Sequence, residues 1–393
     1  MRTADGRDIL DGLAGSMNAN LGHGNSAVAA AMGEQARGLV AVPTIAGDVS
    51  DSALALAERI RQVIGIPDAT CTFMSSGSEA TEAALAVVWK YWSELGQPRK
   101  QKIISLDGSY HGCTLGALAL TGRTDEHLDI PSLIPTFRLA LPAWDPSDAS
   151  RVSRSLEKLL ESIDVDDIGA IFLEPIMGLA GMIPAAVDDI SKVVTICRKN
   201  NILVVLDEAL TGLGRAGRVT AAGMFGLDYD LLLMSKGLGC GFTPIATTCI
   251  ASHVASVLGE TVPALRHGHT SSGNPLAARV AQVVLDQLVA SKAVENALQM
   301  GEVFEQLALN VLSGIGREYP VRATGLCLAV ETDSSEYAQG VRRRAFDLGL
   351  RIRAIDRNII LCPPLIIERK DMLQMVSLLT RAILETERAS TGS

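Results

Sequence analysis

The sequence lacks the cysteine pairs and long apolar runs that mark several classes of protein. Its seven cysteines are scattered singly along 393 residues, without a Cys-x-x-Cys pair. Neither a disulfide framework nor a zinc knuckle is indicated, and reduced thiols in the cytoplasm fit best. Positions 1–10 are polar and charged, unlike the apolar core of a signal peptide, and no apolar stretch approaches the length of a membrane span. We expect a soluble cytoplasmic protein.

The sequence also has fewer basic than acidic residues. The chain has 35 Lys and Arg against 44 Asp and Glu, for a net charge of -9. The sequence therefore indicates no basic patch for binding nucleic acid and no polybasic stretch for binding anionic lipid, which disfavours both partners. The length exceeds what one hydrophobic core supports, so we expect at least two lobes. With 48% apolar and 20% charged residues, the composition is typical of a globular α/β protein.

The middle of the chain does have a regular alternation of short apolar runs with amphipathic segments. Residues 170–173 and 202–206 are aliphatic and β-branched, which predicts strands buried on both faces, and the periodicity of 188–199 predicts a helix between them. Further predicted elements are a strand at 70–74, a helix at 79–92, and strands at 102–106 and 231–234. This order indicates a parallel sheet flanked by helices.

The pattern changes near position 276. A long amphipathic helix is predicted from there to 312, followed by a strand at 321–331. These elements indicate a second lobe. Because the sequence has no internal repeat and no low-complexity linker, we expect the lobes to pack against each other.

Polar residues that directly follow the apolar runs are the candidates for chemistry, because ligands gather at the carboxyl ends of parallel strands. The first group is Ser75-Ser76-Gly77-Ser78, before the helix at 79–92. Free backbone N–H groups and the helix dipole make such a turn a phosphate site. An ordinary serine N-cap is the commoner explanation of the same residues.

Carboxylates follow two neighbouring predicted strands. Asp207 comes after 202–206 with Glu208 beside it, and Glu174 comes after 170–173. A carboxylate there can keep a proton on a buried heterocyclic nitrogen, because opposite charges stabilise each other. Alternatively, Asp207 simply caps the next loop.

Lys236 follows the strand at 231–234 and precedes the glycine-rich residues 237–241. A lysine in apolar surroundings has a lowered pKa and attacks carbonyl groups, as Schiff-base formation requires. Most lysines are instead solvated surface residues. The glycines could suggest a dinucleotide loop, but the fingerprint is incomplete.

The segment 267–275 contains two histidines, His267 and His269, followed by hydroxyl residues. Because it supplies no further His, Cys or Asp, a loop or a phosphate contact is favoured over a metal site, and we predict no metal.

Together these elements resemble the class III aminotransferases, the family of ornithine, GABA and ω-amino acid transaminases. The resemblance covers nearly the whole chain, with Lys236 29 positions after Asp207. The matching motifs are Leu10-Asp11-Gly12, Leu21-Gly22-His23-Gly24, Ser76-Gly77-Ser78-Glu79-Ala80, Tyr110-His111-Gly112, Glu174-Pro175-Ile176, Asp207-Glu208-Ala209-Leu210-Thr211-Gly212-Leu213-Gly214-Arg215, Ser235-Lys236-Gly237, Thr270-Ser271-Ser272-Gly273-Asn274-Pro275 and Cys362-Pro363-Pro364-Leu365.

The resemblance implies an α/β fold of fold type I. A large domain, 50–285, would contain a mainly parallel seven-stranded sheet flanked by helices. A smaller α+β domain would be built from both termini, 1–49 and 286–393.

The resemblance also implies pyridoxal 5'-phosphate (PLP) as cofactor. Lys236 would hold PLP as a Schiff base and shuttle the proton, Asp207 would keep the pyridine nitrogen protonated, and Tyr110 would stack on the ring. Thr270 would reach the phosphate from a neighbouring subunit, which implies a homodimer with shared active sites. The cofactor-binding residues implied are Ser76, Gly77, Ser78, Tyr110, His111, Glu174, Asp207, Leu210, Lys236 and Thr270.

The chain departs from the family pattern in its substrate pocket. Leu210 stands where many members have Gln, and Ile360 where the ornithine and GABA enzymes have Arg, which argues against those substrates. Arg353 resembles the mobile arginine that binds substrate carboxylates in ω-transaminases, although a solvated arginine explains it as well. Met17 replaces an aromatic residue, and relatives usually have a longer arm before Leu10, so we expect Met17 to line a more open pocket.

The leading hypothesis is the transfer of an amino group between an amine or amino acid and a keto acid or aldehyde. An alternative keeps the Lys236 chemistry but breaks another bond, as in decarboxylation, racemisation, elimination or C–C bond formation. A dimeric scaffold without catalysis is the third reading, and the joint presence of Lys236, Asp207, Tyr110 and Thr270 argues against it.

Overall fold

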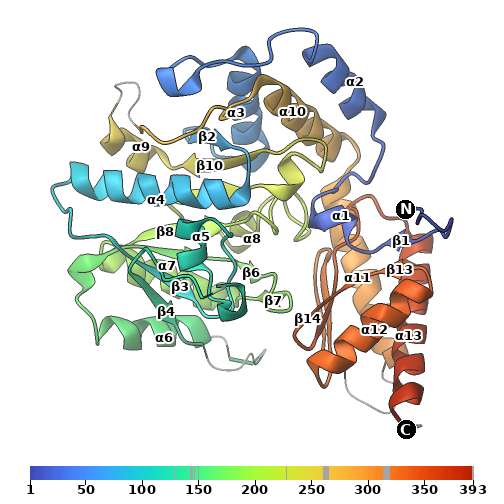
Figure 1. Cartoon of the computed structure of the whole chain (residues 1–393). Helices are drawn as coiled ribbons and strands as arrows, with labels where there is room; N and C mark the ends of the chain where they lie inside the picture. The colour runs from blue at the N-terminus through green and yellow to red at the C-terminus, as the bar shows by residue number, and fades with distance from the viewer. Residues whose placement is uncertain are drawn as a thin grey trace.

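A computed structural model of the chain describes residues 1–127, 129–141, 145, 147–148, 150–226, 228–259, 265–312 and 319–391. Figure 1 shows two lobes side by side. The large lobe is built on the central sheet, and the small lobe contains both ends of the chain.

The central sheet of the described residues has seven strands in the order β2-β10-β9-β8-β5-β3-β4. Their bounds are β2 (Thr70–Met74), β3 (Lys102–Leu106), β4 (Thr136–Leu139), β5 (Ile168–Leu173), β8 (Leu203–Asp207), β9 (Leu231–Met234) and β10 (Ala246–Ile250). The run from β9 to β4 is parallel, whereas β10 is antiparallel to both of its neighbours. The predicted α/β fold with a mainly parallel seven-stranded sheet is confirmed.

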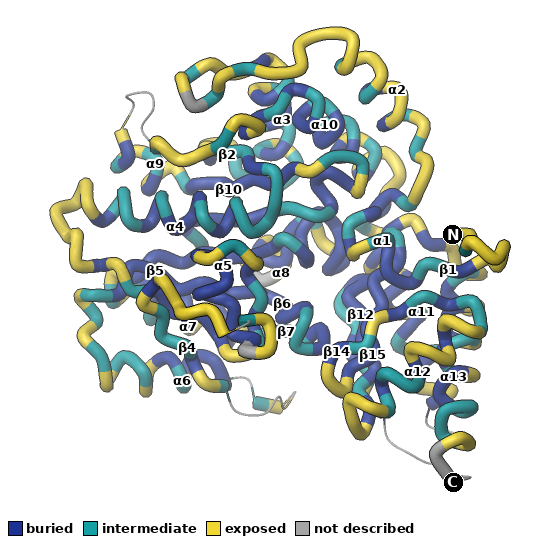
Figure 2. Tube along the Cα trace, viewed as in Figure 1, coloured by how far each residue is buried: buried dark blue, intermediate teal, exposed yellow. Residues whose placement is uncertain are grey.

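The central strands β5, β8 and β9 are almost entirely apolar because both faces of the sheet are covered. Phe172 and Val205 belong to the cluster under helix α4 (Gly77–Glu94), whereas Ile171 and Val204 belong to the cluster on the opposite face. This division follows the two-residue period of a strand. Figure 2 shows the resulting buried layer through the middle of the large lobe.

The helices of the large lobe cover the two faces of the sheet. They are α4 (Gly77–Glu94), α5 (Leu115–Leu120), α6 (Arg151–Leu160), α7 (Val187–Lys199), α8 (Ala221–Phe225), α9 (Ser252–Leu258) and α10 (Pro275–Ala290), with α2 (Ser26–Gln35) and α3 (Asp51–Ile64) packed against α10. The short hairpin of β6 (Ile176–Met177) and β7 (Ile183–Pro184) extends toward the small lobe.

The small lobe is built on an antiparallel sheet of four strands within the described residues, in the order β11-β12-β15-β14. Its elements are β11 (Val321–Thr324), β12 (Cys327–Glu331), β14 (Arg353–Ile355), β15 (Asn358–Leu361), α11 (Ala293–Leu312), α12 (Ser335–Asp347) and α13 (Arg369–Thr391). Near the N-terminus, β1 (Leu10–Asp11) pairs with β13 (Leu350–Arg351) and leads into α1 (Ala14–Met17).

Two expectations for the second half of the chain were wrong. The predicted helix from 276 to 312 is two helices, α10 and α11, because Lys292 adopts a left-handed conformation with φ of 51° that ends the first. The predicted strand at 321–331 is a hairpin that turns at Gly325, whose φ is 55°. Periodicity continued through both breaks, so it gave no sign of either.

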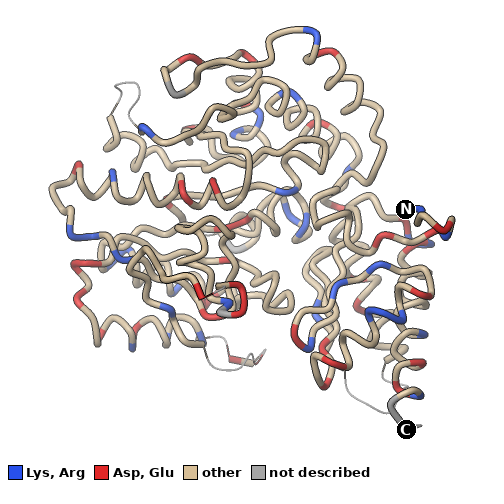
Figure 3. Tube along the Cα trace, viewed as in Figure 1, with Lys and Arg blue, Asp and Glu red and all other residues tan. Residues whose placement is uncertain are grey.

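Charged residues of both signs are interspersed over both lobes (Figure 3). Among the described helices, none is long and apolar enough to span a membrane.

Candidate active site

Four adjacent parallel strands, β9, β8, β5 and β3, end at the same edge of the central sheet, which we call the sheet edge. Lys236 lies two residues beyond β9, and Asp207 is the last residue of β8. Glu174 follows β5 directly, and the loop after β3 carries Tyr110 and His111. The strand order therefore brings these predicted residues to one edge of the sheet.

Asp207 is buried and held from two sides. Its Oδ1 accepts a hydrogen bond from the Ala209 backbone N–H at 3.0 Å, and its Oδ2 lies 2.9 Å from His111 Nδ1. His111 is fixed in turn, because its backbone N–H donates to Thr121 and its carbonyl accepts from Thr81. Among the described residues, its buried Nε2 has no partner. The carboxylate therefore has a set orientation at the end of β8.

Lys236 begins a short 3-10 turn, with φ of 30°, and is half-buried. Desolvation by burial lowers the pKa of its amine, while the negative charges of Asp207 and Glu174 oppose this shift. The amine is therefore neutral at a lower pH than an ordinary lysine, which favours attack on a carbonyl group.

Glu174 connects two loops at the sheet edge. Its Oε1 accepts from the Tyr110 backbone N–H at 2.8 Å, and its Oε2 accepts from that of Gly178 at 3.2 Å. Burial raises the pKa of the carboxyl group to about 7, although His111 acts in the opposite direction.

Glu208, the neighbour of Asp207, serves a different element. Its carboxylate accepts from the backbone N–H groups of Ala221 and Ala222 at 2.6 and 2.7 Å, at the start of α8. It therefore stabilises the N-terminus of that helix. Sequence adjacency could not separate the two carboxylates, since consecutive residues at a strand end point in opposite directions.

Ser76 is the N-cap of α4, with its Oγ accepting from the Glu79 N–H at 3.2 Å. The simple capping interpretation of this serine is thus correct. The same helix start lies against the sheet edge, because a Cβ on Gly77 would be 3.5 Å from the Cβ of Ser235. Ser78 Oγ accepts from the Cys113 N–H at 3.0 Å. A helix N-terminus placed there is suited to a phosphate group.

These features suit one kind of group. An oriented carboxylate matches a protonated ring nitrogen, an amine with a lowered pKa matches an aldehyde, and the start of α4 matches a phosphate. PLP carries all three, so the residues at the sheet edge fit PLP.

The predicted substrate residues come from other parts of the chain. Arg353, on β14, is exposed and makes no hydrogen bond or ion pair with any described residue. Its positive charge nevertheless reaches Lys236, where it adds to the lowering of the amine pKa by burial, and Tyr110, where it opposes the rise in pKa that burial causes. Met17 is buried at the end of α1, with φ of 63°.

Leu210 is buried against the β6–β7 hairpin. A Cβ on Gly178 would come within 2.3 Å of Leu210 Cδ2, so a larger residue there would displace the Leu210 side chain. Thr270 lies in an exposed turn. His269, in the same turn, is 3.4 Å from both Glu79 and Ser75, and no group of possible metal ligands occurs in the part of the chain that the structure describes.

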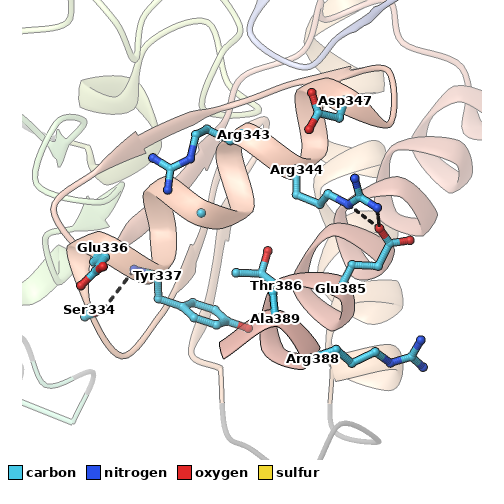
Figure 4. Close-up of a pocket in the computed structure, with 11 residues that line it drawn as sticks. Ser334, Glu336, Tyr337, Arg343, Arg344, Asp347, Glu385, Thr386, Arg388 and Ala389 are labelled. Atoms are coloured by element: carbon cyan, nitrogen blue, oxygen red, sulfur yellow. Dashed lines mark hydrogen bonds and ion pairs between the residues drawn. The ribbon is translucent and has the colours of Figure 1, made fainter. Parts of the chain in front are cut away.

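A hollow of about 950 Å³ lies away from the sheet edge, between α12 and α13 (Figure 4). An ion pair between Arg344 and Glu385 joins the two helices, and the Tyr337 N–H donates to Ser334. No residue predicted to bind cofactor or substrate lines this hollow.

The family model described as aminotransferase class III matches residues 1–383. An acetylornithine aminotransferase from Aquifex aeolicus is 30% identical over 95% of this chain and 92% of its own length. Gamma-aminobutyrate transaminase 1 of Oryza sativa subsp. indica is 28% identical over 98% and 79%.

Two solved structures that are similar to this chain are also transaminases. A PLP-bound amine transaminase from an uncultivated Pseudomonas species is 28% identical with a TM-score of 0.92, covering 98% of this chain and 92% of that one. An (S)-enantioselective omega-transaminase from Thermomicrobium roseum is 28% identical with a TM-score of 0.93, covering 98% and 90%.

Proposed function

The chain belongs to the class III aminotransferase family, and on that premise we propose that Lys236, Asp207 and Tyr110 carry out its chemistry. The family activity is the PLP-dependent transfer of an amino group between an amine or amino acid and a keto acid or aldehyde. The observation that carries the proposal is the meeting of Lys236, Asp207 and the start of α4 at the sheet edge.

Each residue has a role that follows from its surroundings. When bound, PLP supplies an aldehyde and a ring that withdraws electrons from the reacting carbon. Lys236 would hold the cofactor through its amine and, once the substrate amine has displaced it, would accept the proton of the substrate carbon at Nζ. Asp207, held by His111, keeps the facing ring nitrogen protonated. The Tyr110 ring covers one face of the cofactor.

The remaining residues hold the cofactor in place. Ser76, Gly77 and Ser78 bind the phosphate at the start of α4. Glu174, Leu210 and His111 shape the ring site, and a second copy of the chain contributes Thr270 across a homodimer interface. The exposure of Thr270 in a single chain supports this last role.

Arg353 and Met17 form the substrate side, where Arg353 binds a carboxylate when the substrate carries one. The free guanidinium of Arg353 supports this assignment, because charge-assisted pairing with a carboxylate is strong and directional. The relatives named above include enzymes for acetylornithine and gamma-aminobutyrate, which are amino acids, and an amine transaminase. We place the enzyme in the cytoplasm, and we divide it into domains of 50–285 and of 1–49 with 286–393, since the two main sheets fall on either side of that division. Within 1–49, α2 is the exception, because it packs against α10 of the large lobe.

The test is an absorbance spectrum of the purified protein with PLP, recorded again after adding a panel of amines and amino acids. We expect a band that is absent in Lys236→Ala and is bleached by an amino donor as the cofactor takes up the amino group. A Lys236-dependent band that no donor bleaches would favour another carbanion reaction. A band that does not depend on Lys236 would overturn the assignment of that residue.

A further inference from the structure

We propose that the ion pair between Arg123 and Asp356, which joins the two lobes, positions Arg353 to receive the carboxylate of the substrate. Arg123 and Asp356 are positioning residues, because they act through Arg353 and do not touch the substrate. The inference rests on the proposed function of the site.

Arg353 lies on a short hairpin whose tip is Asp356. Strands β14 and β15 pair Arg353 with Ile360 and Ile355 with Asn358, leaving a two-residue turn at Asp356 and Arg357. Asp356 is in the left-handed region, with φ of 49°. Because the turn is this tight, a displacement of the tip is passed along β14 to Arg353, three residues away.

The tip is held by an arginine of the large lobe. Arg123 follows α5, and its side chain is only 9% exposed. One terminal nitrogen donates to Asp356 at 2.9 Å and to the Leu179 carbonyl at 3.1 Å, while the other donates to Asp125 at 2.6 Å. Arg123 thus joins the tip of β14–β15 to the β6–β7 hairpin.

The β6–β7 hairpin belongs to the cofactor side. Glu174 accepts from its Gly178 N–H, and Leu210 packs on Gly178. A second arginine reaches this hairpin from the small lobe, since Arg322 donates to the Gly181 carbonyl at 2.7 Å and to Asn358 at the start of β15. Figure 1 shows the two hairpins facing each other between the lobes.

These contacts form a continuous path from the cofactor site to Arg353. It runs from Glu174 through the β6–β7 hairpin and Arg123 to Asp356, and then along β14. Arg353 itself has no partner among the described residues, although its charge reaches Lys236 and Tyr110. The position of Arg353 is therefore set by the backbone of β14. The Arg123–Asp356 ion pair connects this hairpin to the large lobe.

Asp356→Asn separates this role from folding. Asp356 is 61% exposed, and Arg123 keeps Asp125 and Leu179 as partners in the variant. Asp125→Asn is the matched control, because Asp125 binds the same arginine, is 62% exposed and undergoes the same change, but lies in the large lobe.

The measurement is the rate of the half reaction with increasing donor, for β-alanine, which carries a carboxylate, and for n-butylamine, which lacks one. We expect Asp356→Asn to raise the half-saturating concentration of β-alanine about five-fold, with the maximal rate and the values for n-butylamine unchanged. Asp125→Asn should change neither donor, and Asp356→Glu should restore the original value. An equal effect on both donors, or none on either, would overturn the proposal.

An epistasis test checks that the pair acts through Arg353. Once Arg353→Gln has removed the guanidinium, Asp356→Asn should cause no further rise in the half-saturating concentration of β-alanine. An additional five-fold rise in that background would show that Asp356 acts by another route.

Hydrogen exchange of the apoprotein gives a readout that needs no activity. Amides of peptides covering 353–361 should exchange faster in Asp356→Asn than in Asp125→Asn or the unchanged protein. Equal exchange would contradict the positioning role. If the Lys236-dependent band is present but no donor of the panel reacts, the proposed function fails, while hydrogen exchange still decides whether Asp356 holds the hairpin.

Discussion

The sheet edge and the β14–β15 hairpin contribute to the same candidate site in opposite ways. Asp207 and Glu174 are buried at the ends of parallel strands and hold their orientation through several hydrogen bonds. Arg353 is exposed, without a partner among the described residues, on a hairpin tied to the other lobe by side chains. The comparison indicates that strand order fixes the cofactor side, whereas contacts between the lobes set the substrate side.

The largest effect should come from Asp207→Asn, which removes a buried negative charge at the sheet edge. We expect kcat to fall about 1000-fold, equivalent to about 4 kcal/mol, for donors with and without a carboxylate. The cause is loss of the negative charge that keeps the ring nitrogen protonated. Steady-state kinetics with both donor types checks this, and circular dichroism controls for folding. A fall in kcat confined to donors with a carboxylate would contradict the assignment of Asp207 to the cofactor side.

Glu174→Gln should alter the pH dependence of stability. The folded pKa of Glu174 is raised to about 7, so the folded protein retains a proton that the unfolded chain loses near pH 4.5. Its contribution to stability therefore declines as pH rises from about 4.5 to about 7, by at most about 3 kcal/mol. Glutamine removes that decline, so urea unfolding of the apoprotein at pH 5 and pH 8 should differ less in the variant.

Glu208→Gln is the comparison variant for Glu174→Gln in the unfolding and activity measurements. Burial also raises the pKa of Glu208 to about 7, so its stability contribution declines over the same pH range. Because Glu208 holds the start of α8, its substitution should leave the pH profile of kcat unchanged, whereas Glu174→Gln should shift that profile. Identical activity profiles for the two variants would argue against a place for Glu174 in the cofactor site.

Arg353→Gln should have a smaller effect than Asp207→Asn and a more selective one. Loss of a charge-assisted pair should raise KM for a carboxylate donor about 10-fold, or about 1.4 kcal/mol, with n-butylamine unaffected. Donor kinetics measure both values. A matching rise for n-butylamine would show that Arg353 shapes the pocket without recognising the carboxylate.

Much of the sheet edge could be predicted because its determinants are local in sequence. Apolar runs marked the strands, and the polar residues after them marked positions such as Asp207 and Lys236. The antiparallel direction of β10 was not predictable in this way, since an apolar run carries no information about its partners. The separate task of Glu208 was also missed, because it depends on where α8 begins.

The contacts of the hairpin could not be predicted from one sequence. Arg123 and Asp356 are 233 positions apart, and nothing near either residue marks it as a partner of the other. Charged residues in polar segments are ordinarily solvated at the surface. Only the packing of the lobes shows that these two form an ion pair.

The place of β2 at the end of the sheet has a consequence for the order of assembly. Within the described residues, β2 joins the sheet through β10 alone, which follows it in the chain by about 175 residues. At typical rates of synthesis, β10 leaves the ribosome roughly 10–35 s after β2. The strand that leads into Ser76, Gly77 and Ser78 therefore remains an unpaired edge throughout that interval, and the phosphate site is completed late although its residues are synthesised early.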